Sequence, residues 1–291
     1  INDGAFYGCN NLNTVYVCNS IDNIDSSKFE MFYNGDLPEN IFYFDETTGT
    51  ITKYVGSATN VEIPSTINGI DVTTIGSEAF KGNTSMQSVV IPNSVTSIGE
   101  GAFHSCRALT SIEIPSSVTS IGDSAFNGCN RLNTVYVCNS IDNIDSSKFK
   151  ISDNGDLPKN VFYFDNSNGT ITKYVGSATE LTIPSKINGV EVKDISDNVF
   201  LNCSSLNTVY VYNSSIDSSK FRISDNGDLP KNVFYFDNST GTITGYDGSD
   251  ADVVIPSEIG GVKVTTIGSE AFKGNTSIQS VVIPKGVTSI G

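Results

Sequence analysis

Six cysteines and one histidine are the side chains of this 291-residue chain best suited to redox, metal or nucleophilic chemistry. Cys106 and Cys129 stand 23 residues apart, and Cys9 and Cys203 lie in comparable stretches of sequence. No C-x-x-C pair occurs, which counts against a structural zinc site. The cysteines are therefore predicted to be small thiols of the core, with disulfides as the open alternative.

His104 is the only histidine, and no serine or cysteine accompanies it in the arrangement of a catalytic triad. The equivalent places in other parts of the chain hold Lys81, Asn127 and Lys273, which indicates a position that faces solvent. The sequence also has no paired catalytic carboxylates and no phosphate-binding loop. It therefore predicts a protein that is not an enzyme, with no catalytic residues and no cofactor.

Turns rich in aspartate and asparagine raise the question of calcium binding. They read DNSNGT at 165–170 and DNGD at 153–156 and 225–228. An EF-hand loop needs oxygen ligands at fixed positions and a bidentate glutamate at its end, and these segments do not supply that order. Turns closed by their own side chains explain the same residues. No metal site is predicted, and calcium stays open as the alternative.

The elements that carry these residues repeat along the chain. Segments 75–97 and 98–120 are nearly the same sequence, with Ile75, Ile98 and Ile121 at the same place in successive repeats. A repeat this short cannot bury its apolar edge alone, whereas stacked repeats bury a continuous core. The pattern predicts a solenoid, rich in β structure, in which strands of successive coils pair in parallel.

Within each repeat, a short strand with one buried face is expected on one side and a short helical turn at Ala-Phe on the other. Pro92 and Pro115 end two of these strands, because proline cannot donate the next hydrogen bond of a sheet. The strands are expected to form one parallel sheet through 89–91, 112–114 and 135–137. The predicted core residues are Phe80, Phe103, Phe126, Leu109, Leu132, Cys106 and Cys129.

A second, longer unit occurs three times. Two apolar stretches surround a short polar loop that ends in glycine, which predicts a β-hairpin built into or beside the solenoid sheet. The hairpins are expected at 40–59, 160–179 and 232–251. A short helical turn is expected before each hairpin, with an aspartate as its N-cap. The segments are 21–29, 141–149 and 215–221, and the caps are Asp25, Asp145 and Asp217.

The consensus L-x-x-[VI]-x-[VI]-P-x-x-V-T-x-I-G-x-x-A-F-x-x-C resembles the BspA-type leucine-rich repeat. Residues 75–137 carry it almost without fault, and 1–17, 195–211 and 267–291 carry it in part. The hairpin with its following IPSxINGxxV stretch looks like the segment that often precedes such repeats in bacterial surface proteins. The resemblance implies a leucine-rich-repeat solenoid bearing β-hairpin modules, a secreted or cell-surface location, and roles in adhesion and host-protein binding.

One solenoid is expected over residues 1–291, in blocks 1–74, 75–120, 121–194, 195–266 and 267–291. Ile1 stands in the column of Ile75, and Gly291 follows VTSI, so we expect the chain to be cut within a repeat at both ends. Two explanations stay open. The chain is a segment of a longer repetitive protein, or its uncapped ends meet those of the next subunit in a head-to-tail filament.

Outward strand positions are the candidate binding residues: Tyr16, Val90, Glu113, Tyr136, Tyr210 and Val282. Small hydroxyl residues precede them on the same face, and tyrosine among serine and threonine is typical of recognition surfaces. The alternative is a solvated sheet with scattered aromatics. A net charge of −15 disfavours nucleic acid and anionic membranes as partners. No apolar run of about 18 residues occurs, so membrane insertion is not predicted.

These observations predict a non-catalytic, adhesin-like repeat protein, extracellular or at the cell surface. It would bind a host or matrix protein, or a glycan, through the sheet face. The alternative is a structural protein that polymerises with copies of itself, end to end, into extracellular filaments.

Overall fold

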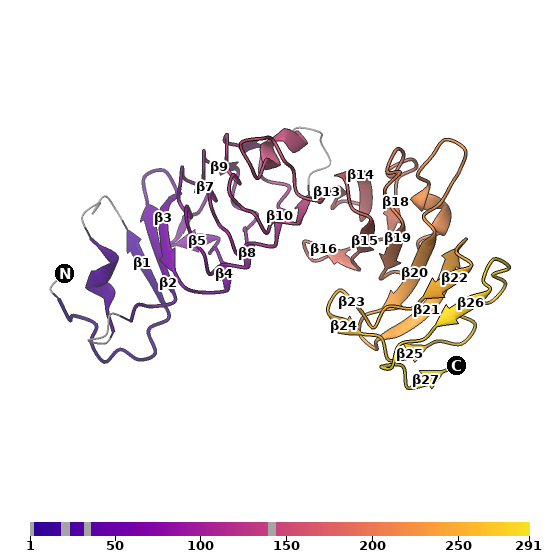
Figure 1. Ribbon diagram of the computed structural model, residues 1–291. Coiled ribbons are helices and arrows are strands. Elements are labelled where there is room, and N and C mark those ends of the chain that lie inside the picture. Colours follow the sequence, from indigo (N-terminus) through magenta and orange to yellow (C-terminus); the bar gives the residue numbers. More distant parts are fainter. Residues whose placement is uncertain (1–2, 19–23, 32–35, 139–143) are drawn as a thin grey trace. The chain divides into compact units, whose positions relative to one another are not determined.

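The computed structural model describes residues 3–18, 24–31, 36–138 and 144–291 (Figure 1). The chain divides into two compact units, Ile1–Val161 and Phe162–Gly291. Each unit is a β-solenoid in which short strands and turns wind into stacked coils, as predicted. Ile1 and the first residues of 21–29 and 141–149 lie outside the described residues, and the expectation of one solenoid over the whole chain stays a prediction.

The first unit has strands on two sides of its coils. A six-stranded sheet runs through β1 (Thr14–Cys18), β2 (Asn40–Asp45), β3 (Thr50–Gly56), β7 (Thr74–Ile75), β9 (Ser97–Ile98) and β11 (Ser120–Ile121), in that order, and its last three strands form one side of the repeats. The other side holds β4 (Asn60–Glu62) paired with β8 (Ser88–Val90), and β10 (Ser111–Ile114) paired with β12 (Thr134–Val137). A small hairpin joins β5 (Thr66–Ile67) to β6 (Ile70–Asp71).

The predicted coil stacking is confirmed by the strand register. Ile75 pairs with Ile98, and Ile98 with Ile121, in parallel ladders. On the other side, β10 and β12 also pair in parallel. The expected sheet through 89–91, 112–114 and 135–137 is less continuous than predicted: β8 forms a two-stranded sheet with β4, separate from the sheet that holds β10 and β12. Between the coils of β8 and β10, the Thr110 N–H donates to the Gln87 carbonyl at 3.1 Å.

A stack of aromatic rings fills the interior of the first unit. Phe103 lies between Phe80 and Phe126, with ring centroids 5.1 Å and 5.5 Å apart. The seven predicted core residues are at most 2% exposed. The Ala-Phe segments of these coils are hydrogen-bonded turns and not helices. The alanine N–H groups of Ala79 and Ala102 bond within their own coil, whereas those of Phe80 and Phe103 bond to the neighbouring coil. The Phe103 N–H, for example, donates to the Ala125 carbonyl at 2.8 Å.

The predicted hairpin at 40–59 is built into the sheet. β2 pairs antiparallel with β3, and β3 then pairs in parallel with β7, the first strand of the next coil. Both faces of β2 are covered. Ile41 packs in a cluster with Val17 and Phe29 on one side, while the Phe42 ring packs at a tilt against Tyr54 on the other. The hairpin is therefore a wall between two parts of the core.

The second unit also combines a six-stranded sheet with further strand pairs. Its six-stranded sheet is β15 (Glu180–Ile183), β19 (Thr208–Val211), β20 (Asn232–Asp237), β21 (Thr242–Gly248), β25 (Thr266–Ile267) and β27 (Ser289–Ile290). The other pairs are β14 (Thr170–Gly176) with β18 (Asp194–Ile195), β16 (Lys186–Ile187) with β17 (Val190–Glu191), β22 (Asp252–Val254) with β26 (Ser280–Val282), and β23 (Glu258–Ile259) with β24 (Val262–Lys263). The boundary between the units falls within β13 (Asn160–Asp165), which neighbours β14 in one sheet.

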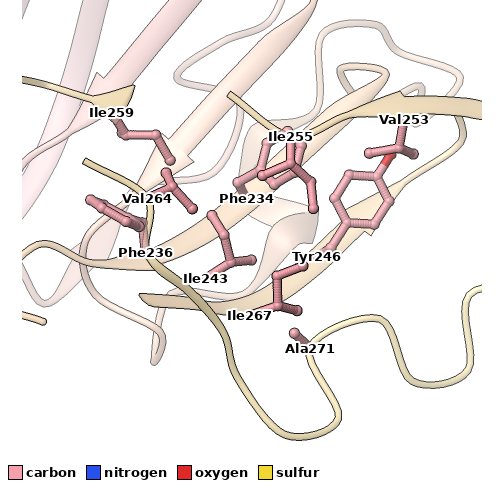
Figure 2. Close-up of a cluster of buried hydrophobic side chains, with 10 residues drawn as sticks. All are labelled: Phe234, Phe236, Ile243, Tyr246, Val253, Ile255, Ile259, Val264, Ile267 and Ala271. Atoms are coloured by element: carbon pink, nitrogen blue, oxygen red, sulfur yellow. The ribbon is translucent and has the colours of Figure 1, made fainter. Parts of the chain in front are cut away.

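The predicted hairpin at 232–251 is β20 with β21, which pair antiparallel. Figure 2 shows the cluster that packs on one face of this hairpin, where Phe234, Phe236 and Tyr246 meet aliphatic residues of the coils that follow. Val233, on the opposite face of β20, is also fully buried. This hairpin is therefore covered on both faces too.

The predicted helical turns are one-turn 3-10 helices, η1 (Ser26–Phe29), η2 (Ser146–Phe149) and η3 (Ser218–Phe221). The predicted aspartates cap them, since each accepts a hydrogen bond from the N–H two residues later, at 2.8–2.9 Å. A lysine of each helix forms an ion pair with the preceding coil. The pairs are Lys28 with Asp3, Lys148 with Asp123, and Lys220 with Asp197.

Candidate binding surface

Four outward residues occupy the same strand position in four coils of the first unit: Glu62, Val90, Glu113 and Tyr136. They project outward because they alternate with buried residues, such as Val89 beside Val90. Strand pairing places Glu62 directly beside Val90, and Glu113 directly beside Tyr136. We call this set the strand-face row.

Val90 is the most exposed apolar side chain of the strand-face row, at 59%. Glu62 is exposed, and Glu113 and Tyr136 are half-buried with interactions of their own. One pleat earlier lies a line of small polar residues, in which the Ser88 hydroxyl donates to Asn60 Oδ1 at 2.7 Å. The face thus presents an aliphatic and an aromatic group among carboxylates and hydroxyls.

Tyr16 and Tyr210, which were predicted to point outward, also pack against buried aromatic rings. Each stacks on a buried phenylalanine of the following hairpin, Tyr16 on Phe42 and Tyr210 on Phe234, with ring centroids 5.8 Å apart. Tyr16 is still 46% exposed, whereas Tyr210 packs against the cluster of Figure 2. Burial, with Glu180 as a second cause, raises the pKa of Tyr210 to about 12. Tyr210 is therefore half-buried at the boundary of the core and less open than Tyr16.

Val282 belongs to a separate patch in the second unit. It pairs with Val254 across β22 and β26, and the two side chains are 56% and 63% exposed. Sequence reasoning missed Val254, and also Glu62 in the first unit. Each of them directly precedes an Ile-Pro pair, as Glu113 precedes Ile114-Pro115. This shared sequence pattern would have identified both positions.

The cysteines are free thiols in varied surroundings. Cys106, Cys129 and Cys138 are buried, and the first two donate to the carbonyls of Phe80 and Phe103 at 3.1 Å. Cys18 and Cys203 are half-buried. The core prediction is wrong for Cys9, which is exposed. Burial, with the Glu113 carboxylate as a second cause, raises the pKa of the Cys138 thiol to about 12.

Thiol labelling should separate these groups. In the folded chain at pH 8, Cys9 should react quickly with a disulfide reagent, because it is exposed. Cys106, Cys129 and Cys138 should react at least about 10³-fold more slowly, because their labelling requires the coils to open. Mass spectrometry of the labelled peptides measures this directly. Rapid labelling of Cys129 in the folded chain would contradict the burial of this column.

The remaining candidates for chemistry have local structural partners. His104 is half-buried, and its Nδ1 lies 3.0 Å from the Ser105 hydroxyl. Asp165 accepts hydrogen bonds from the Ser167 N–H and hydroxyl, as expected of a turn closed by its own side chain. In the described part of the chain, no group of three or more His, Cys, Asp or Glu residues could hold a metal ion. Likewise, no helix among these residues is long and apolar enough to cross a membrane.

Stacked coils with parallel strands, phase-locked apolar columns and an exposed strand face define a leucine-rich-repeat solenoid. The chain belongs to the family of the BspA type leucine rich repeat region, which matches it in six copies over residues 1–71, 51–175, 162–242 and 252–291. This confirms the resemblance seen in the sequence.

Solved structures similar to this chain are also leucine-rich-repeat proteins. The leucine-rich-repeat protein of T. pallidum is 20% identical, with 83% of this chain and 77% of that chain covered and a TM-score of 0.29. One from Eubacterium ventriosum is 17% identical, with a TM-score of 0.38; 96% of this chain matches 57% of that longer one. A leucine-rich cell surface protein of Faecalibacterium prausnitzii is 22% identical, with a TM-score of 0.29. The match covers 98% of this chain and 70% of that chain. No curated protein matches the chain in sequence.

Proposed function

We propose that this chain is a non-catalytic, adhesin-like repeat module, secreted or held at the cell surface, that binds a protein through the strand-face row. Membership of the BspA-type family supports a repeat scaffold whose task is contact with another molecule. The observation that carries the proposal is Val90, an aliphatic side chain 59% exposed at the middle of a regular strand face.

The composition of the face supports a protein ligand over a glycan. Protein interfaces commonly surround an apolar or aromatic centre with polar groups, and Val90 and Tyr136 lie among Glu62, Glu113 and small hydroxyl residues. A pleated strand face offers area and little depth. Area suits a protein surface, whereas small ligands and sugars favour concave sites.

The substitution Val90→Arg should abolish recognition while sparing the fold. It places a long charged side chain at the centre of the strand-face row. Changes at the centre of an interface usually cause the largest loss of binding free energy. Binding to a panel of immobilised matrix and plasma proteins should weaken at least tenfold for any protein that wild type retains. Unfolding free energy should change by no more than about 0.5 kcal/mol, because the side chain points to solvent.

The matched control is Ser120→Arg, which places the same charge on β11 of the other sheet at an exposed serine. It should bind as wild type does. Equal binding by wild type and Val90→Arg would contradict the proposal. Light scattering over a concentration series accompanies the assay, because growth in mass without a partner would favour the filament alternative instead.

A further inference from the structure

We propose that the second unit contains a binding groove for a neutral oligosaccharide, separate from the strand-face row. The groove has a volume of about 620 Å³. That volume lies within the range of typical small-ligand sites, about 300–1,000 Å³. Its lining includes Ser218, Leu229, Asp247, Ser249, Lys273 and Thr276.

Three segments that are distant in sequence form the walls. They are the loop after η3 at 228–230, the end of β21 at 247–249, and the turn at 273–277. Asn275 ties two walls together, since its Nδ2 donates to the Gly248 carbonyl at 2.8 Å and its Oδ1 accepts from the Ser277 N–H at 3.0 Å. The Ser249 N–H donates to the Lys231 carbonyl at 3.0 Å, which holds the end of β21 beside the loop at 228–230. Hydrogen bonds within the protein therefore join all three walls.

The lining chemistry selects the class of ligand. Carboxylates of Asp228 and Asp247 accept hydrogen bonds, and the hydroxyls of Ser249 and Thr276 both donate and accept. Sugar hydroxyls match such mixed walls. Leu229 is 37% exposed and offers an apolar surface for the C–H face of a sugar ring. Purely apolar ligands would leave these polar groups unsatisfied.

Charge then disfavours anionic ligands. The two carboxylates repel anions such as phosphates and acidic sugars. Lys273 lines the same groove, but its ammonium is paired with Glu270 at 2.7 Å, so it offers little attraction to an anion. An uncharged polyhydroxyl ligand avoids this repulsion.

The hairpin of β20 and β21 contributes one wall of the groove. Its sequence differs there from the other two hairpins of the chain. Residues 52–59 and 172–179 both read TKYVGSAT, whereas 244–251 read TGYDGSDA. Asp247 stands where the other hairpins have valine. The lysine of each other hairpin lies over a tyrosine ring, 5.4 Å away at Lys53 and 4.8 Å at Lys173. In the third hairpin, Gly245 stands in place of this lysine. The Tyr235 hydroxyl there lies 3.5 Å from a carboxylate oxygen of Asp247.

A glycan array probed with the labelled full chain tests the proposal, followed by titration calorimetry with the uncharged oligosaccharides retained. Ser249→Trp fills the groove from an exposed position and should weaken binding at least tenfold. Asp247→Val restores the residue of the other hairpins and should weaken it about tenfold, by removing an acceptor for the sugar hydroxyls. The control Ser57→Trp makes the same change at the equivalent place of the first hairpin and should bind normally.

Val90→Arg should also leave this binding unchanged, which separates the groove from the strand-face row. The proposal is overturned if wild type retains no uncharged oligosaccharide, or if Ser249→Trp and Asp247→Val both bind as wild type does. Retention of charged glycans only would overturn it as well.

Discussion

Phe103→Ala should lower the free energy of unfolding by about 3–5 kcal/mol, as expected for a buried aromatic replaced by alanine. The Phe103 side chain is fully buried, and its ring stacks on Phe80 and on Phe126, with interplanar angles of 20° and 3°. The substitution removes apolar burial and two ring contacts, and it leaves a cavity between coils. A solenoid coil can relax little into such a cavity, because the coils above and below are fixed by their backbone hydrogen bonds.

Chemical denaturation of wild type and variant measures the loss, and hydrogen exchange locates it. Because each coil contacts only its neighbours, exchange should accelerate most in the coils around residues 80–126. The control Phe103→Leu keeps an apolar side chain of similar length and should cost less than about 1.5 kcal/mol. A loss below 1 kcal/mol for Phe103→Ala would argue that the ring stack does not hold the coils together.

Gly122→Ala should destabilise the chain by about 3 kcal/mol, at the upper end of the usual cost of overpacking. A Cβ at Gly122 would run into the backbone nitrogen of Glu100, and it would lie 2.5 Å from the carbonyl carbon of Gly99 in the preceding coil. Both obstacles are backbone atoms, which cannot move aside as a flexible side chain can. The glycine of the VTSIG stretch therefore sets how closely two such coils can stack.

Gly268→Ala is the matched control, because Gly268 holds the equivalent place in a coil that follows a hairpin. Its added Cβ would lie 3.0 Å from the Ile243 carbonyl oxygen, a looser contact. The chain itself has Ser196 at the same place after the second hairpin. Denaturation should thus show a much smaller loss for Gly268→Ala. Equal losses at both glycines would contradict the account of coil spacing.

The parts of the fold readable from the sequence are those fixed by spacing along the chain. Ile75, Ile98 and Ile121 share one column because coils of equal length stack in register. The aspartate caps were predictable because they act over two residues. The Ala-Phe turns were not, since residues such as Phe103 have their hydrogen-bond partners in the neighbouring coil, which a local propensity cannot anticipate.

The candidate surface was predictable only where a strand has a single buried face. Tyr210 was expected outside because it alternates with buried Val209 and Val211, yet the hairpin that follows turns this side toward another part of the core. The unbroken apolar run of β20 was the available signal, because strands buried on both faces lose their alternation. The groove of the second unit could not be predicted, since its walls come from three separate segments.

Hydroxyl-radical footprinting of the chain with and without its retained protein ligand tests the strand-face row most directly. We expect protection of Val90 and Tyr136 in the complex, with Thr96 and Thr119 on the other side of the coils labelled as in the free chain. Protection of Thr96 and Thr119, with Val90 and Tyr136 labelled equally in both states, would contradict recognition through this face.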